Sequence, residues 1–126
     1  MKKVLATTSA PAAIGPYSQA IHAGDFVFVS GQLPIDPATG EFAGDDIAAQ
    51  TRQSLTNIQN ILASDGLTMA NVVKTTVLLK NISDFGAMNE VYATFFAGDC
   101  PARAAFEVGA LPKNALVEIE AIVYAG

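Results

Sequence analysis

The stretch Phe26-Val27-Phe28-Val29 is apolar at every position. A strand with one wet face would alternate apolar and polar side chains, so this strand is expected to be buried on both faces. Residues 17–23 are expected to pair with it through a tight turn at Gly24-Asp25. The strand is expected to stop at Ser30-Gly31-Gln32, and residues 34–40, which contain proline and glycine, predict an ordered turn.

Helical periodicity predicts two helices farther along the chain. The first is capped by Asp45 or Asp46 and stops near Gly66. Its buried stripe, at steps of three and four, consists of Ile47, Thr51, Leu55, Ile58 and Leu62. The second helix starts at Ser83 or Asp84 and ends near Gly98. It is expected to bury four side chains at helical spacing, Phe85, Met88, Tyr92 and Phe95.

Three further strands are expected at residues 72–79, which are rich in β-branched side chains, at residues 102–108 and at residues 116–124. A turn at residues 111–114 separates the last two. One face of the final strand is wholly apolar and consists of Val117, Ile119, Ala121 and Val123. The order of strands, helix, strand, helix and strands predicts one α+β domain, residues 1–126, with two helices packed on one face of a sheet.

The composition indicates that the chain assembles with copies of itself. Two helices cover only one face of a sheet, whereas residues 26–29 are expected to need cover on the other face too. Charged residues make up 15% of the chain, below the usual fraction of about a quarter. The simplest cover is the sheet of another copy, which predicts a homo-oligomer with its active clefts between subunits.

Charge and cysteine content exclude several classes of function. The net charge is -5 and the seven basic residues are scattered, which argues against a nucleic-acid partner. Cys100 is the only cysteine and His22 the only histidine, so a zinc site of the usual kind is not expected. An all-carboxylate metal site stays open, although the acidic residues lack the spacing of a calcium loop. No apolar run is long enough for a membrane span or a secretory signal, which predicts a cytoplasmic protein.

Arg103 is the most informative candidate for a site residue. It lies in an expected strand among alanines, which leave room around its guanidinium. The planar guanidinium fits a carboxylate through two parallel hydrogen bonds, so Arg103 is a candidate anchor for a small acid. The alternative is a structural ion pair with Glu107, Glu118 or Glu120.

Glu118 and Glu120 are two residues apart, so their side chains point to the same face of the last strand. Mutual repulsion and burial would raise at least one pKa toward the range useful for acid–base catalysis. The alternative is that both carboxylates are solvated. Tyr17 and Ser30 offer hydroxyls, and Gly31 is expected to let backbone N–H groups approach a ligand. Cys100 and the serines lack a neighbouring general base, so covalent catalysis by a thiol or hydroxyl nucleophile is not expected. The reaction class that remains is hydrolysis or isomerisation of a small acid with an already labile bond.

Five blocks of sequence, in order along the chain, resemble the reactive intermediate (enamine/imine) deaminase family, also called the Rid, YjgF-like or L-PSP endoribonuclease family. The blocks are residues 14–20 (IGPYSQA), 30–32 (SGQ), 101–105 (PARAA), 111–113 (LPK) and 117–121 (VEIEA). The resemblance implies a chorismate-mutase-like mixed sheet with two helices on one face. It also implies a homotrimer with three clefts between subunits.

The resemblance further implies the reaction of a 2-iminobutanoate/2-iminopropanoate deaminase. Threonine and serine dehydratases, which use pyridoxal phosphate, release 2-aminocrotonate and 2-aminoacrylate. The family hydrolyses the derived imines to 2-oxo acids and ammonia and itself uses no cofactor and no metal. The dehydratases would thus be functional partners of this chain. Two other functions stay open: a non-catalytic acid-binding or chaperone-like trimer, and an endoribonuclease, against which the acidic balance argues.

Carried over by motif, the resemblance implies that Arg103 binds the substrate carboxylate and that Glu118 holds and polarises the attacking water. The residues implied to line the pocket are Tyr17, Ser30, Gly31 and Asn89. Many relatives have a cysteine two residues after the arginine, where this chain has Ala105. A thiol role is excluded at that position, whereas backbone contacts from Ala105 remain.

Overall fold

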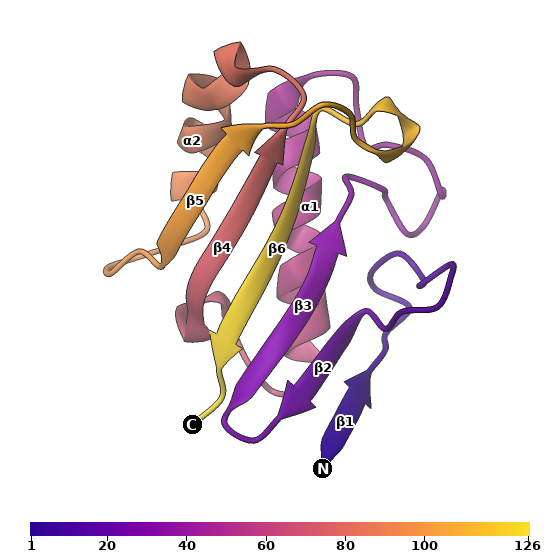
Figure 1. Ribbon diagram of the computed structural model, residues 1–126, viewed down its shortest axis with the longest axis vertical. Helices are drawn as coiled ribbons and strands as arrows, with labels where there is room; N and C mark the ends of the chain where they lie inside the picture. The colour runs from indigo at the N-terminus through magenta and orange to yellow at the C-terminus, as the bar shows by residue number, and fades with distance from the viewer.

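The C-terminal strand β6 (Val117–Tyr124) lies between β3 (Phe26–Gln32) and β4 (Val72–Leu79) and pairs antiparallel with both. The computed structural model describes residues 1–126, and its six strands follow the order β1-β2-β3-β6-β4-β5 (Figure 1). Only β4 and β5 (Ala102–Glu107) are parallel. The predicted mixed α+β sheet is therefore confirmed.

The N-terminal part of the sheet is wider than predicted. The predicted hairpin is present, but β2 (Ala20–Ala23) begins three residues later than expected. The reason is the side chain of Gln19, which bonds the backbone of Thr7 and Pro11 and holds the preceding segment as a loop. The strand β1 (Lys2–Leu5) pairs with β2 and was not predicted, because it is short and begins with two charged residues.

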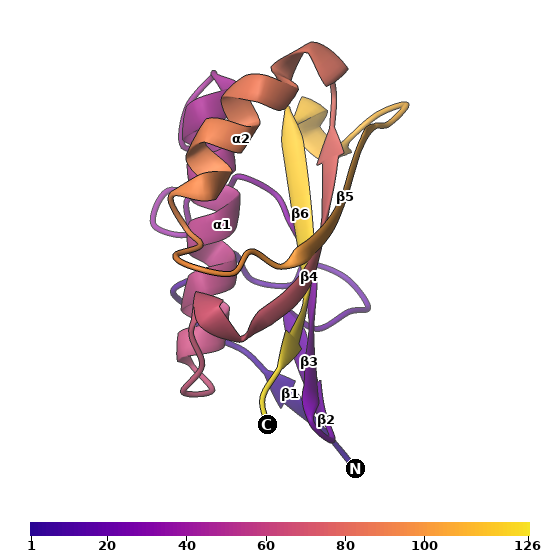
Figure 2. The ribbon, with the colours of Figure 1, turned by 90° about the vertical axis from the view of Figure 1, so that its left-hand side faces the viewer.

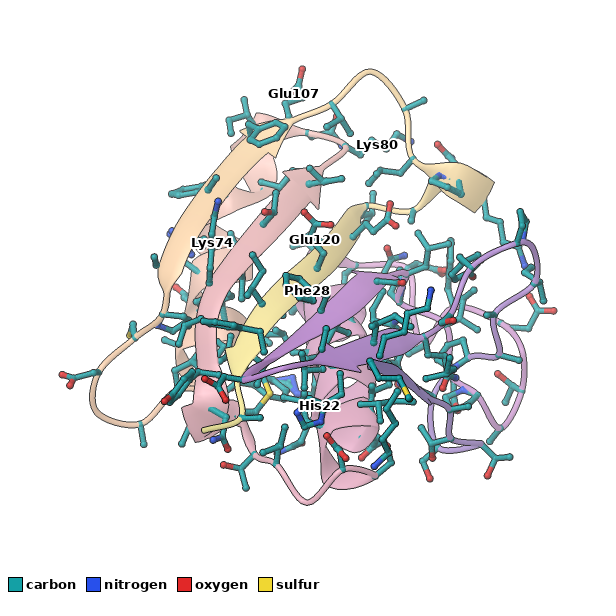
Figure 3. All side chains as sticks on the ribbon, turned by 60° about the horizontal axis from the view of Figure 1, so that its bottom comes forward. His22, Phe28, Lys74, Lys80, Glu107 and Glu120 are labelled. Atoms are coloured by element: carbon teal, nitrogen blue, oxygen red, sulfur yellow. The ribbon has the colours of Figure 1, made fainter.

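One ion-paired cluster ties this sheet edge to the loop after α1. Asp65 accepts a hydrogen bond from Lys3 Nζ at 3.0 Å and lies 2.6 Å from His22 Nδ1. The bond from Lys3 keeps the pKa of Asp65 below its ordinary value despite desolvation. Figure 3 shows His22 in this region. His22 is partly buried and bonded at both ring nitrogens.

Both helices pack on the same face of the sheet, as predicted (Figure 2). The helix α1 (Ile47–Ala63) begins at Asp46, whose Oδ1 accepts from the Ala49 N–H at 2.7 Å. The helix α2 (Phe85–Ala93) ends earlier than Gly98. Just beyond it, the Thr94 hydroxyl bonds the Val91 carbonyl, a contact that competes with further helical bonding. Neither helix combines the length and apolar character that crossing a bilayer requires.

The core lies between the helices and the sheet. The predicted apolar face of β6 is buried at all four positions, and Leu55, Ile58 and Leu62 of the α1 stripe are fully buried. Ile47 is only partly buried. On α2, Met88 and Tyr92 are buried whereas Phe85 and Phe95 are partly so, and Phe96 takes the deeper position.

The face of the sheet without helices is apolar and open in the single chain. Val27 and Val29 are buried on the helix side, but Phe26 and Phe28 remain 41% and 48% exposed. One chain covers only one side of the sheet, so the predicted burial of the second face by another copy of the chain stays a prediction. Figure 3 shows Phe28 and Glu120 on this face. Four strands contribute neighbouring apolar side chains there: Val4, Ile21, Phe28 and Ile122.

The buried hydroxyls of α1 lead to a stability prediction. Thr51 Oγ1 and Ser54 Oγ have no hydrogen-bond partner. We expect Ser54→Ala to raise the free energy of unfolding by about 1 kcal/mol, because it removes an unpaired buried polar group and improves helix propensity. Urea denaturation at fixed protein concentration measures the change. Ser64→Ala, whose hydroxyl bonds the Ile61 carbonyl, is the control and should not stabilise. A lower midpoint for Ser54→Ala would contradict the prediction.

Candidate active site

Arg103 and Glu118 lie on opposite faces of the sheet. Arg103 pairs with Thr75 of β4, whose side chain is buried on the helix side. Glu118 alternates along β6 with Val117 and Ile119, which point into the core, so Glu118 faces the open side. Within one chain the two residues therefore do not share a pocket, and the sequence predicted a cleft between subunits. A pocket built from two neighbouring chains stays a prediction.

No carboxylate of the chain neutralises Arg103. The ion pairs of the structure are those that Asp65 makes with Lys3 and His22. Arg103 therefore makes no ion pair with a glutamate of its own chain. A guanidinium cannot lose its charge at ordinary pH, so Arg103 presents a permanent, unpaired cation.

Three side chains of the helix α2 contact the Arg103 guanidinium. Arg103 Nη1 donates to Asn89 Oδ1 at 2.6 Å. The guanidinium carbon lies 4.9 Å from the centre of the Tyr92 ring and 5.3 Å from that of Phe85. The structure thus brings together Arg103 and Asn89, as the resemblance implied. Ala105 follows on the same face of β5, paired with the buried Val77, and is partly buried.

Sequence reasoning gave the two aromatic residues only a core role. Phe85, Asn89 and Tyr92 are spaced by four and three residues, so they share one face of α2. This spacing was attributed to packing alone. The signal that would have identified a site is the polar Asn89 between two aromatic residues of the predicted buried stripe.

The candidate site has two parts, which we call half-sites. The first is Arg103 with its α2 neighbours, and the second is a cavity of about 540 Å³ on the open side of the sheet. Its lining brings together four predicted residues: Tyr17, Ser30, Gly31 and Glu118. The register between β3 and β6 shifts between Val29 and Gln32, which marks a bulge at this point of the sheet. Ser30 Oγ donates to the Ser18 carbonyl at 2.6 Å and fixes the start of the bulge.

Gly31 makes room for Glu118. A Cβ atom at Gly31 would collide with Glu118 Oε2 and lie 3.0 Å from its carboxyl carbon. The predicted role of Gly31, to let backbone N–H groups approach a ligand, stays a prediction. The structure adds a second reason for a glycine here, which is the close approach of a carboxylate from β6.

Burial raises the pKa of Glu118, and the neighbouring Glu120 carboxylate raises it further. The predicted upward shift is therefore confirmed, and the alternative of two fully solvated carboxylates does not hold for Glu118. No hydrogen bond offsets either effect. A carboxyl group in this state takes up and releases a proton closer to neutral pH than an ordinary glutamate.

The two other residues considered for chemistry, Cys100 and His22, lie outside both half-sites. Cys100 is a free, exposed thiol, and His22 is held by Asp65 and the Gly24 carbonyl. No three His, Cys, Asp or Glu side chains lie close enough together to hold a metal ion.

Comparison with known proteins gives matches over nearly the whole chain. The model of the family described as Endoribonuclease L-PSP matches residues 7–125. A RutC family protein from Pyrococcus horikoshii is 56% identical over 98% of both chains. The 2-iminobutanoate/2-iminopropanoate deaminase of Mus musculus is 48% identical over 100% of this chain and 93% of its own length. A solved Rid-family protein of unknown function from Yersinia pestis superposes with a TM-score of 0.96 at 49% identity, covering 98% of this chain and 99% of its own.

The contact between Gly31 and Glu118 is testable without an activity assay. We expect Gly31→Ala to push the Glu118 carboxylate out of its cavity at little cost to the fold, because the atoms that would collide are the end of a flexible side chain. Nuclear magnetic resonance (NMR) titration of the Glu118 carboxyl carbon should show its pKa falling toward the ordinary value. Gly109→Ala, where a Cβ meets nothing within 4 Å, is the matched control. An unchanged Glu118 pKa in Gly31→Ala would refute this account.

The raised pKa of Glu118 predicts a pH dependence of stability. The folded state binds the Glu118 proton more tightly than the unfolded chain, so stability falls as pH rises from the ordinary glutamate value through the raised one. Glu120→Gln removes the charge repulsion and should lower the Glu118 pKa, although burial keeps it above normal. Urea midpoints measured across this range check both statements. Glu90→Gln, at an exposed site on α2, should leave the profile unchanged.

Proposed function

Because this chain belongs to the Rid (YjgF-like) family, whose model is described as Endoribonuclease L-PSP, we propose that it hydrolyses reactive 2-enamine and 2-imine acids to 2-oxo acids and ammonia. Its substrates would be the imines of 2-aminoacrylate and 2-aminocrotonate. The name of the mouse relative supports this choice of substrate. The observation that carries the proposal is the Arg103 cation, which no carboxylate of its own chain neutralises.

In the proposed reaction, Arg103 binds the substrate carboxylate. One N–H group bonds Asn89, and the other donors are left for a ligand. Two parallel hydrogen bonds to a carboxylate would fix both the position and the orientation of a small acid. The substrate would thereby supply the negative charge that the chain does not.

Glu118 would manage the proton transfers. Its carboxylate accepts a proton from water as the oxygen adds to the imine carbon. The proton then passes to the imine nitrogen, and a carbinolamine forms. The carbinolamine hydroxyl then gives up its proton, through Glu118, to the same nitrogen as the C–N bond breaks. This step forms the C=O group of the 2-oxo acid and releases ammonia. The raised pKa of Glu118 supports this role, because a general base is most effective when its pKa lies near the working pH. Imines already hydrolyse in water, so orientation of one water and charge neutralisation are sufficient catalysis.

The two half-sites would meet between chains. In one chain Arg103 faces α2 and Glu118 faces the open side of the sheet, so neither half-site is complete. The apolar open face, with Phe26 and Phe28 exposed, supports burial against another copy. We therefore propose a homotrimer in which each interface joins Arg103 of one protomer to Glu118 of the next, since a head-to-tail contact closes into a ring.

The substrate class suggests the cellular setting. Dehydratases that use pyridoxal phosphate release these enamines, so a serine or threonine dehydratase would supply the substrate, with the reaction proposed for the cytoplasm. The deaminase itself would need no cofactor. The family description, Endoribonuclease L-PSP, also suggests RNA cleavage. The net charge of -5 and the absence of a histidine from both half-sites disfavour an RNA substrate.

Coupled kinetics test the proposed reaction. Purified chain should accelerate 2-oxobutanoate release from threonine when a threonine dehydratase is present. We expect Arg103→Ala and Glu118→Gln each to reduce kcat/KM by about 100-fold or more. Arg52→Ala, at the exposed arginine of α1, is the control and should behave as wild type. Full activity of Arg103→Ala would refute the proposal; ligand binding without turnover in wild type would favour a non-catalytic binder.

Mixing two inactive variants tests whether the site is shared. Arg103→Ala and Glu118→Gln, unfolded together and refolded in equal amounts, form interfaces of which about one quarter carry both intact residues by random assortment. Activity should recover to about that fraction, while each variant refolded alone stays inactive. Recovery of no activity in verified mixed oligomers would show that both residues act within one chain or not at all.

A further inference from the structure

We propose that Phe85 and Tyr92 are positioning residues that hold the Arg103 guanidinium in place for a carboxylate. The effect of these two rings on catalysis rests on the proposed function, whereas their contact with Arg103 does not. The guanidinium carbon lies over both rings, at 5.3 Å from the centre of Phe85 and 4.9 Å from that of Tyr92. A cation at such distances is attracted to the negative face of an aromatic ring. We call these two rings the aromatic seat.

The aromatic seat restrains a side chain that would otherwise be mobile. Arg103 is exposed, and an exposed arginine on a strand normally samples many rotamers. The rings lie against the guanidinium, and Asn89 Oδ1 bonds Nη1 at one edge. The remaining N–H donors are left for a ligand. A carboxylate that binds a restrained guanidinium does not have to order it first, and this raises affinity.

Tyr92 of the aromatic seat is held in place by its own contacts. The Tyr92 hydroxyl lies 2.7 Å from Thr75 Oγ1 inside the core, which fixes the ring to β4 directly beside the strand that bears Arg103. Burial raises the pKa of Tyr92, although the Thr75 bond and Arg103 oppose this, so the ring remains a neutral phenol. Phe96 packs against Tyr92 with ring centres 4.8 Å apart.

The proposal predicts an effect on binding rather than on chemistry. The carboxylate is held equally in the substrate complex and in the transition state. Loss of the seat should therefore raise KM and leave kcat nearly unchanged. A substitution that only damages the fold would reduce kcat together with the fraction of folded protein.

NMR spectroscopy tests the seat without any assay of activity. The chain has two arginines, so the side-chain Nε–Hε spectrum contains one signal from Arg52 and one from Arg103. Ring currents should move the Arg103 signal upfield of Arg52, and Phe85→Leu or Tyr92→Leu should return it toward the Arg52 position. Met88→Leu, a buried change on the same helix, should not move it. An Arg103 signal that is unshifted in wild type, or insensitive to both ring removals, overturns the proposal.

Kinetics then test the consequence. Phe85→Leu should raise KM by about two- to five-fold, because Arg103 is exposed, with kcat unchanged. Phe85→Tyr keeps a ring and should recover most of the lost affinity. For Tyr92, the pair Tyr92→Phe with Thr75→Val keeps the ring and removes both buried hydroxyls, so it separates the ring from the hydrogen bond.

The outcomes distinguish the two proposals. Equal losses of kcat in Phe85→Leu and Phe85→Tyr would overturn the positioning role. A wild-type chain with the upfield Arg103 signal but no turnover would refute the deaminase and confirm the seat. Turnover without the upfield signal would support the deaminase and overturn the seat.

Discussion

The alternation of side chains along β6 is the constraint on which the rest of the molecule depends. This strand lies between β3 and β4, and every second side chain points into the core beneath the helices. The intervening side chains, Glu118 and Glu120 among them, must then point to the opposite side. One strand thus supplies the centre of the hydrophobic core and the acidic group of the candidate site, and neither can move without the other.

Each half-site carries an electrostatic imbalance that its own chain does not relieve. Arg103 is a cation without an anion, although the chain has an excess of acidic residues. Glu118 is a carboxyl group whose ionised form is disfavoured by burial and by Glu120. A small acid bound between them would neutralise the first group, and proton transfer would use the second.

The same physical logic explains why α2 matters more than its length suggests. It covers the edge of the sheet where β5 runs parallel to β4, and so it faces Arg103 across a short distance (Figure 1). Its apolar face has two tasks, since Tyr92 is buried in the core and also contacts the guanidinium. A helix that packs in this way couples the stability of the core to the placement of a charged side chain.

Local periodicity in the sequence determined the hairpin, the α1 stripe, the apolar face of β6 and the helices on one face of one sheet. It also determined that Glu118 and Glu120 share a face, because side chains alternate along a strand whichever strands pair with it. Only the tertiary structure decided that Arg103 and Glu118 face opposite sides, because that depends on how β5 and β6 each register with β4. It likewise decided that Gly31 accommodates a carboxylate and that two core aromatics contact an arginine. These contacts join residues far apart in the chain, and strand pairing, which no local pattern encodes, brings them together.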